Sequence, residues 1–398
     1  MAASSSPAPS GHLHYYQEHG ISPVRYGIET LAAHFDRRDS LYRSLGLPPA
    51  AFRGVRVLEV APGSGQNSLY VAACRPQSFD LVEPNPAGRR DIEAAYAGLD
   101  CDHTVPALHP VRFEDFEAEA PFDIVLCENW LGSLPTEVAL IRKLASLVAP
   151  GGALVLTVVP LAGFFPNVMR KLLALRLVDD SLDFDDKTEL LTDVFGPHLA
   201  TIAKMTRSHR DWVHDCMLNP HYLNVALPLE TVVDAIGDQM EALATFPRFT
   251  ADWRWFKGLT GEERGFNALT LTSYRENAHN LVDYRRTFPP RRAEENAPVV
   301  AASHTLHQTA IRWQTAAEAG DTGALPAISE EIGASLSKIG DSLGDFDPGL
   351  VDAIEELSAV WSKDTLTASS VREMTSFASL FGRETIYVSF TRPHTPTC

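Results

Sequence analysis

The feature that most constrains the fold is a glycine turn between an apolar strand and a helix. Residues 55–60 read Val-Arg-Val-Leu-Glu-Val, which is typical of a buried strand, and residues 61–66 read Ala-Pro-Gly-Ser-Gly-Gln. Glycine permits a sharp turn and lets the backbone approach a ligand with no side chain in the way. A helical stretch follows and extends to about Arg75. Strand, turn and helix together predict the first unit of a parallel sheet with a ligand at its edge.

Apolar strands and amphipathic helices continue to alternate after this turn. We expect strands over residues 79–83, 122–127 and 153–159, and helices over residues 86–98 and 136–147. This alternation predicts an α/β fold of the doubly wound, Rossmann-like kind. In such a fold a mostly parallel sheet is covered by helices on both faces.

The rest of the sequence divides the chain into three regions. Residues 1–50 combine a tail rich in Ala, Ser and Pro, which we expect to be disordered, with an N-terminal helical segment. Residues 51–275 form the α/β domain, with a helical insertion around residues 160–240. Residues 276–398 are expected to form a mainly helical C-terminal region. Additional strands are expected at residues 243–246, 269–272 and 384–391.

The net charge limits the classes of partner. The chain carries a formal net charge of −17, and an acidic surface repels nucleic acid phosphates and anionic lipid headgroups. We therefore expect a small-molecule partner, neither nucleic acid nor a membrane, and we regard a homodimer as compatible with the sequence. The five cysteines lack metal-ligand spacing and the chain starts without a signal peptide, which indicates a cytoplasmic protein with no metal site.

An acidic residue follows the glycine turn at the distance that ribose recognition requires. Glu83 ends the second expected strand, 20 residues after Gly63. In folds of this type an acidic side chain at that position reaches ribose hydroxyls. The turn Gly63-Ser64-Gly65 lacks the third glycine of the dinucleotide fingerprint, so an NAD-dependent dehydrogenase is a weaker interpretation.

Four segments together resemble the class I S-adenosylmethionine-dependent methyltransferases. They are residues 57–65, Glu83, residues 122–125 (Phe-Asp-Ile-Val) and residues 147–152 (Leu-Val-Ala-Pro-Gly-Gly), in the order of that family. The resemblance implies S-adenosyl-L-methionine as the cofactor and methyl transfer as the activity. It also implies that Gly63 and Gly65 border the methionine end of the cofactor and that Glu83 holds both ribose hydroxyls.

The resemblance extends to the adenine end of the cofactor. It implies that Glu114 or Asp115, with Glu114 favoured, meets the adenine amine, and that Phe113 or Phe116 lies against the ring. Glu59, near the end of the first strand, either meets the amino group of the cofactor or is structural.

The acceptor site is expected in the loop after residues 122–127, because ligands of such sheets bind at the carboxyl ends of strands. Residues 128–137 (Glu-Asn-Trp-Leu-Gly-Ser-Leu-Pro-Thr-Glu) are similar to the double-glutamate loop of arginine N-methyltransferases, with Glu128 and Glu137 nine residues apart. Two carboxylates that grip a protonated guanidinium can leave one nitrogen with a usable lone pair. Glu128 and Glu137 are therefore the candidate catalytic residues, although a carboxylate at 137 equally suits the start of a helix.

Three other residues are candidates for contact with the acceptor. Tyr16 belongs to a segment similar to the N-terminal helix that closes over the cofactor in the arginine family. Trp130 follows Glu128 in the acceptor loop, where a lid or core role is the alternative. His209 lies in a stretch rich in histidine and aspartate, and one such residue could serve as general base for a hydroxyl.

These observations predict a methyltransferase that acts on a small polar metabolite, with N-methylation of a guanidine or amine such as free arginine favoured. O-methylation of a sugar or natural-product hydroxyl is the alternative, and a non-catalytic cofactor-binding scaffold is a third interpretation. The chain departs from protein arginine methyltransferases. Gly132 lies one position late, a Thr-His-Trp triplet is missing, and no barrel is expected after the sheet.

Overall fold

One sheet of seven strands organises the described part of the chain, which in this computed structural model is residues 11–22, 28, 30–132, 137–179, 181–344 and 346–394. The strand order is β3-β2-β1-β4-β5-β7-β6. The tail expected over residues 1–10 lies outside the described residues. The strands are β1 (Arg56–Val60), β2 (Ser78–Val82), β3 (Ala107–His109), β4 (Phe122–Cys127), β5 (Val148–Val158), β6 (Glu241–Phe246) and β7 (Ile386–Thr391).

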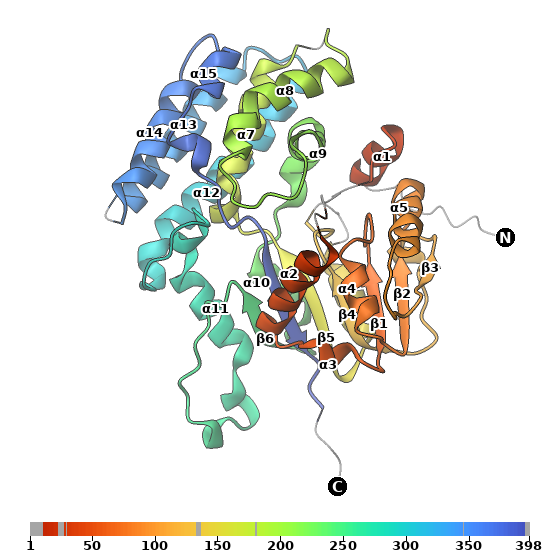
Figure 1. Cartoon of the computed structure of the whole chain (residues 1–398). Coiled ribbons are helices and arrows are strands. Elements are labelled where there is room, and N and C mark those ends of the chain that lie inside the picture. Colours follow the sequence, from red (N-terminus) through yellow and green to blue (C-terminus); the bar gives the residue numbers. More distant parts are fainter. Residues whose placement is uncertain are drawn as a thin grey trace, which may run out of the picture.

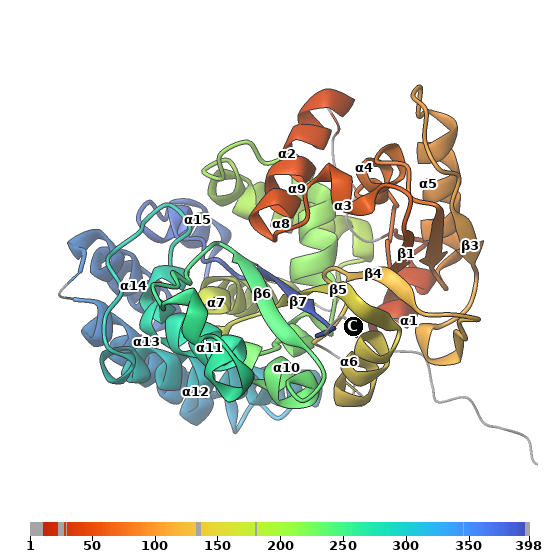
Figure 2. The ribbon, with the colours of Figure 1, turned by 90° about the horizontal axis from the view of Figure 1, so that it is seen from below.

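The first five strands are parallel, and β7 runs antiparallel to both of its neighbours, β5 and β6. Helices lie on both sides of this sheet (Figure 2). The predicted doubly wound, mostly parallel Rossmann-like sheet is therefore confirmed. The strands expected from the apolar runs at residues 79–83, 122–127 and 153–159 correspond to β2, β4 and the second half of β5.

Alternate residues of each strand enter different cores, because successive side chains of a strand point to opposite faces. In β1, Val57 packs with Tyr42 in one core and Leu58 packs with Leu140 in the other. The first core is covered by α2 (Leu31–Ser44), α4 (Ser68–Ala73) and α5 (Pro86–Ala97), and the second by α6 (Glu137–Ser146) and α10 (Leu229–Ile236).

Except for α10, the helices of the expected insertion pack with those of the C-terminal region into one helical body beside the sheet (Figure 1). Their shared core contains Val168, Leu306 and Leu336, all fully buried. The body consists of α7 (Leu161–Leu177), α8 (Phe184–Leu199), α9 (His209–Trp212), α12 (Ala293–Glu318), α13 (Leu325–Leu343), α14 (Pro348–Trp361) and α15 (Ala368–Arg372).

The chain returns from this helical body to the sheet as β7, the strand expected at residues 384–391. β7 lies between β5 and β6, pairing Ile386 with Val158 and Tyr387 with Phe246. A division of the chain at residue 276 therefore cuts through a single sheet, because the C-terminal region supplies one of its inner strands.

The strand expected at residues 269–272 is wrong. These residues lie within helix α11 (Phe266–Glu276). The sequence Leu-Thr-Leu-Thr alternates as a strand would, yet the buried residues Thr270 and Ser273 are three apart, the spacing of a helix face.

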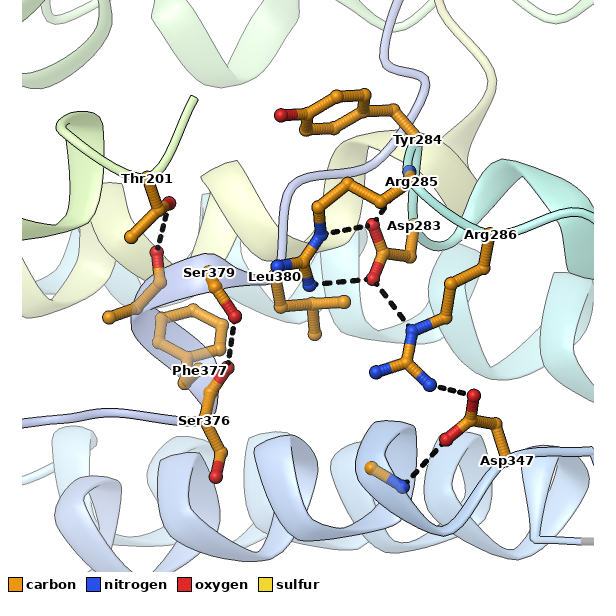
Figure 3. A network of polar contacts seen from close by, with 12 residues as sticks. Thr201, Asp283, Tyr284, Arg285, Arg286, Asp347, Ser376, Phe377, Ser379 and Leu380 are labelled. Carbon is orange, nitrogen blue, oxygen red and sulfur yellow. Dashed lines mark hydrogen bonds and ion pairs between the residues drawn. The ribbon is translucent and has the colours of Figure 1, made fainter. Parts of the chain in front are cut away.

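A polar network joins residues 283–286 to the start of α14 (Figure 3). The carboxylate of Asp283, 1% exposed, accepts a bond of 2.8 Å from Arg285 and one of 3.2 Å from Arg286. Arg286 also pairs with Asp347 at the start of α14. Arg383 donates to the main-chain oxygens of residues 283 and 284. The path into β7 is therefore fixed by charge-assisted bonds as well as by apolar packing.

In the described ranges, no helix combines the length and the apolar character that crossing a membrane requires.

Candidate active site

A cavity of about 390 Å³ lies at the carboxyl ends of β1, β2 and β4, the edge where sheets of this kind bind ligands. Part of its lining comes from the residues that follow these strands and from those that follow β3 and β5. Other parts come from α1 (Gly11–Glu18), α7, the chain after α8 and the segment at the start of β7. Polar or charged members of the lining include His12, Tyr16, Glu83, Asn85, Arg112, Glu114, Asn129, Arg207, Asp215, Tyr222 and Glu384.

The glycine turn after β1 has the backbone geometry expected from its sequence. Gly63 and Gly65 have φ angles of 58° and 70°, in the left-handed region that favours glycine. A side chain at Gly65 would also place a Cβ atom 2.6 Å from Cγ1 of Ile92. Gly63 lines the cavity, whereas Gly65 lets α5 approach the turn closely.

Glu83 lies directly beside this turn. Its Oε2 atom accepts a bond of 3.0 Å from the amide of Gly63, and its Oε1 atom accepts one of 2.8 Å from the amide of Asn85. Burial raises the pKa of Glu83 to about 7. Each carboxylate oxygen has lone-pair capacity beyond one amide bond, so the fixed carboxylate can still accept ligand hydroxyls.

The residues expected at the adenine end are divided between the cavity and the core. Glu114 lines the cavity, with Phe113 and Trp130, and pairs with Arg112 at 2.7 Å. The rings of Phe113 and Trp130 meet edge to face at 5.8 Å. Asp115 and Phe116 are not part of the lining, and the buried Phe116 packs against the ring of His109. Of the alternatives, the structure places Glu114 and Phe113 at the cavity.

Glu59 points into the protein and not into the cavity. It is 3% exposed, and its Oε2 atom has no hydrogen-bond partner among the described residues. Burial, and secondarily the Glu128 carboxylate, raises the pKa of Glu59 to about 7. Glu59 does not line the cavity, which favours the structural alternative.

The structure corrects the expected placement of the two acceptor-loop glutamates. Glu128 accepts two bonds from Arg38, at 2.6 and 2.8 Å, and one of 2.8 Å from the hydroxyl of Tyr42. Glu137 begins α6 and accepts a bond of 2.6 Å from the amide of Gly132. Neither glutamate lines the cavity. Residues 133–136 between them lie outside the described residues.

Two non-glycine residues adopt left-handed backbone conformations at the cavity. Ala61 follows β1 and Asn129 follows β4, and each has a φ angle of 55°. The amide of Asn129 donates to Oγ1 of Thr157 at 2.7 Å, which fixes this turn. Such conformations are costly for residues with a Cβ atom, and they concentrate at ligand sites.

Helix α1 closes one side of the cavity, through Tyr16. The Tyr16 hydroxyl donates to Oδ1 of Asp215 at 2.5 Å, and Arg207 pairs with the other oxygen of Asp215 at 2.8 Å. Although burial opposes it, the Arg207 guanidinium lowers the pKa of Asp215. The Tyr15 hydroxyl adds a bond of 2.8 Å to the main-chain oxygen of His214.

Asp215 lies on the π-helical turn η2 (Val213–Leu218), and such turns are frequent at functional sites. The expected candidate from this stretch, His209, begins α9 and does not line the cavity. The residue of this stretch that lines the cavity next to Tyr16 is Asp215.

Sequence reasoning missed Glu384. Its Oε2 atom accepts bonds from the side-chain amide of Asn167 and from the hydroxyl of Tyr222, and burial raises its pKa. Because β7 is antiparallel to β5, the residues before β7 lie at the carboxyl end of β5. The sequence signal that could have indicated Glu384 is an acidic residue directly before the last expected strand, if that strand is taken to be antiparallel.

Across the described ranges, no group of three or more His, Cys, Asp or Glu side chains could hold a metal ion.

Comparison with known proteins identifies the sheet region. Residues 27–206 match a family model described as a methyltransferase domain. This segment contains the glycine turn, Glu83 and strands β1 to β5. It is a methyltransferase domain, and together with the sheet it confirms the predicted resemblance to the class I S-adenosylmethionine-dependent methyltransferases.

Individual relatives match only parts of the chain. A ubiquinone biosynthesis O-methyltransferase from Xanthomonas euvesicatoria pv. vesicatoria (strain 85-10) is 35% identical over 108 residues, 26% of this chain and 43% of that protein. The chain thus spans less than half the length of this curated relative. Among solved structures, the N-methyltransferase NodS from Bradyrhizobium japonicum WM9 is 14% identical, with a TM-score of 0.34 over 58% of this chain and 88% of that one. PKMT2 from Rickettsia typhi is 13% identical, with a TM-score of 0.41 over 63% and 52% of the two chains.

Proposed function

We propose that the chain is an S-adenosylmethionine-dependent methyltransferase that acts on a small polar acceptor. The observation that carries this proposal is the carboxylate of Glu83, fixed by two main-chain amides beside the glycine turn and facing a cavity at the edge of a methyltransferase domain. When bound, S-adenosylmethionine supplies a methyl carbon on a positively charged sulfur.

The residues at the cavity fit the adenosine part of that cofactor. Glu83 has the acceptor atoms that two ribose hydroxyls require, and the flat faces of Phe113 and Trp130 suit a purine. The Glu114 carboxylate accepts from an exocyclic amine. Gly63 leaves the backbone open to the ligand. All five residues line the same cavity.

The volume of the cavity, about 390 Å³, favours a small acceptor. Tyr16 of α1, Tyr222 and Glu384 also line it, and they come from three distant parts of the chain. We propose methylation at nitrogen, with an amine as acceptor. The guanidine of free arginine is less well supported, because Glu128 is already paired with Arg38.

Methylation of a hydroxyl is the second candidate. The Xanthomonas relative is named an O-methyltransferase, and a hydroxyl acceptor is therefore the second candidate for this chain. In this chain a carboxylate such as Glu384 could accept a hydroxyl proton equally well in geometric terms. The two candidates differ in the acceptor atom and share the cofactor site.

The cofactor assignment is tested by calorimetric titration of the full chain with S-adenosylhomocysteine. Glu83→Ala should weaken binding by about 1–3 kcal/mol, the usual cost of removing bonds to a charged group. Glu93→Ala, an exposed glutamate on the neighbouring helix α5, is the matched control and should bind as the wild type does. Failure of the wild type to bind S-adenosylhomocysteine would overturn the proposed function.

The acceptor class is tested by incubation with a cofactor carrying a labelled methyl group. Paired panels of amines and alcohols with the same carbon skeletons should be supplied. We expect label in the amines. Transfer to alcohols alone would establish the second candidate instead.

A further inference from the structure

We propose that Glu384 binds the reacting nitrogen of an amine acceptor and takes up the proton that this nitrogen loses during methylation. This inference rests on the proposed methyltransferase function and extends it to a residue outside the matched domain, which ends at residue 206. Glu384 is thereby a candidate catalytic residue supplied by the C-terminal region.

The path of the chain places Glu384 at the cavity. Two residues later β7 begins, and Ile386 pairs with Val158 at the carboxyl end of β5. The antiparallel direction of β7 therefore carries the residues before it to the edge where the parallel strands end. Glu384 lines the cavity together with Thr385 and Tyr387.

Hydrogen bonds hold one oxygen of Glu384 and leave the other available. Both protein donors, Asn167 and Tyr222, bind Oε2. Within the described residues we find no donor to Oε1 and no ion pair to this carboxylate. A ligand in the cavity is therefore the natural partner of Oε1.

The charges around the cavity favour a cationic ligand at this position. Asp215 is compensated by Arg207 and Glu114 by Arg112. A second guanidinium that interacts with the Glu384 charge, that of the buried Arg170, donates to the main-chain oxygens of residues 377, 378 and 380. A buried carboxylate without a counter-ion is costly, and an ammonium group would compensate it, whereas an alcohol would not.

The environment also suits proton uptake. Burial raises the pKa of Glu384, Arg207 opposes that rise, and Asp215 adds to it. A carboxylate whose pKa is raised is a stronger base than an exposed one, and catalysis favours a base whose pKa approaches the working pH. Asn167 and Tyr222 remain as donors that hold the group in place.

The step balances as follows. The ammonium form of the acceptor docks on Glu384 and gives one proton to Oε1, which leaves a nitrogen lone pair. That pair forms a bond to the methyl carbon while the bond from this carbon to sulfur breaks, and the sulfur keeps the electron pair. The products are the methylated ammonium ion and S-adenosylhomocysteine, and Glu384 releases its proton to water.

Binding of simple amines provides a test that needs no turnover. The protein, saturated with S-adenosylhomocysteine, is followed by thermal unfolding with methylammonium, benzylammonium or hexylammonium, each beside the matching alcohol. At least one amine should raise the Tm of the wild type in a saturable way, and its alcohol should raise the Tm less. E384Q should weaken the apparent amine affinity about tenfold or more.

Two variants control this experiment. E384D keeps the charge but withdraws it by one methylene group, so it should retain more amine affinity than E384Q. E356Q removes a carboxylate that accepts from the amides of Thr375 and Phe377 and does not line the cavity, so amine affinity should be unchanged.

The outcomes separate this inference from the proposed function. If S-adenosylhomocysteine binds but no amine does, or if E384Q binds amines as the wild type does, the inference on Glu384 is overturned and the methyltransferase proposal stands. Stronger binding of the alcohols than of the amines also overturns it. If S-adenosylhomocysteine does not bind, the proposed function fails first.

Discussion

The carboxylate of Glu128 and the guanidinium of Arg38 lie 2.6 Å apart, with side-chain exposures of 5% and 7%. The pair joins α2 to the end of β4, and the hydroxyl of Tyr42 donates to the same carboxylate. Removing one partner of such a buried pair destabilises a protein far more than replacing both by apolar residues, because the remaining partner is an uncompensated buried charge.

We therefore expect Arg38→Ala to lower the free energy of unfolding by about 3–5 kcal/mol. The double variant Arg38→Met with Glu128→Leu should recover most of that loss. Denaturant unfolding followed by circular dichroism measures both. Arg43→Ala, which breaks the exposed pair with Asp39 on the same helix, is the control and should cost under about 1 kcal/mol. Equal losses for Arg38→Ala and Arg43→Ala would contradict the burial argument.

Glu59 should make stability depend on pH. Its pKa is about 7 in the folded protein against an ordinary value of 4.5, so the folded state holds the proton more tightly. The contribution of the protonated Glu59 to the stability of the folded protein is complete below pH 4.5, and it is lost as the pH rises through about 7. Glu59→Gln should therefore unfold at a higher temperature than the wild type at pH 8, with a smaller difference at pH 5. Thermal unfolding from pH 5 to 8 measures this, and parallel curves for the two proteins would count against it.

Glu83 should make cofactor affinity depend on pH in the opposite direction. Its pKa in the free protein is about 7, and the ionised carboxylate is the better acceptor for ribose hydroxyls. The Kd for S-adenosylhomocysteine should fall as the pH rises from 6 to 8. Glu83→Gln should bind more weakly at pH 8 and lose most of this dependence. A wild-type Kd that is constant across this range would argue against an ionised Glu83 in the complex.

The bond between Tyr16 and Asp215 should hold α1 over the cavity. Tyr16→Phe keeps the ring and removes a bond to a charged group, worth about 1.5–3 kcal/mol, so α1 should open roughly 10- to 100-fold more often. Hydrogen exchange of the α1 amides should rise accordingly. Tyr96→Phe is the matched control, because the buried Tyr96 hydroxyl has no partner among the described residues. Similar exchange in Tyr16→Phe and wild type would show that apolar packing alone holds α1.

Local sequence predicted the strands that start the sheet, because apolar runs bounded by turn residues determine them. The glycine turn and Glu83 were predictable for the same reason: their spacing is set within one strand-helix unit. The assignment of residues 269–272 failed because Leu-Thr-Leu-Thr fits a strand alternation and a helix face alike, and packing decides between them.

The acceptor side of the cavity depends on contacts across the whole chain. The spacing between Glu128 and Glu137 could not predict the ion pair with Arg38, which lies on a helix 90 residues earlier in the sequence. Asp215 and Glu384 meet the cavity only because α1, η2 and β7 converge there. These contacts arise from tertiary packing, so the sequence pattern of a single segment does not predict them.

The position of β7 has a consequence for how the chain is made. Val158 of β5 pairs with Ile386 of β7, which follows it in the chain by 228 residues. At about 5–20 residues per second of synthesis, the edge of β5 stays without this partner for roughly 10–45 s. An unpaired strand edge is a template for wrong pairing. The nascent sheet therefore depends on protection of that edge until β7 has been synthesised.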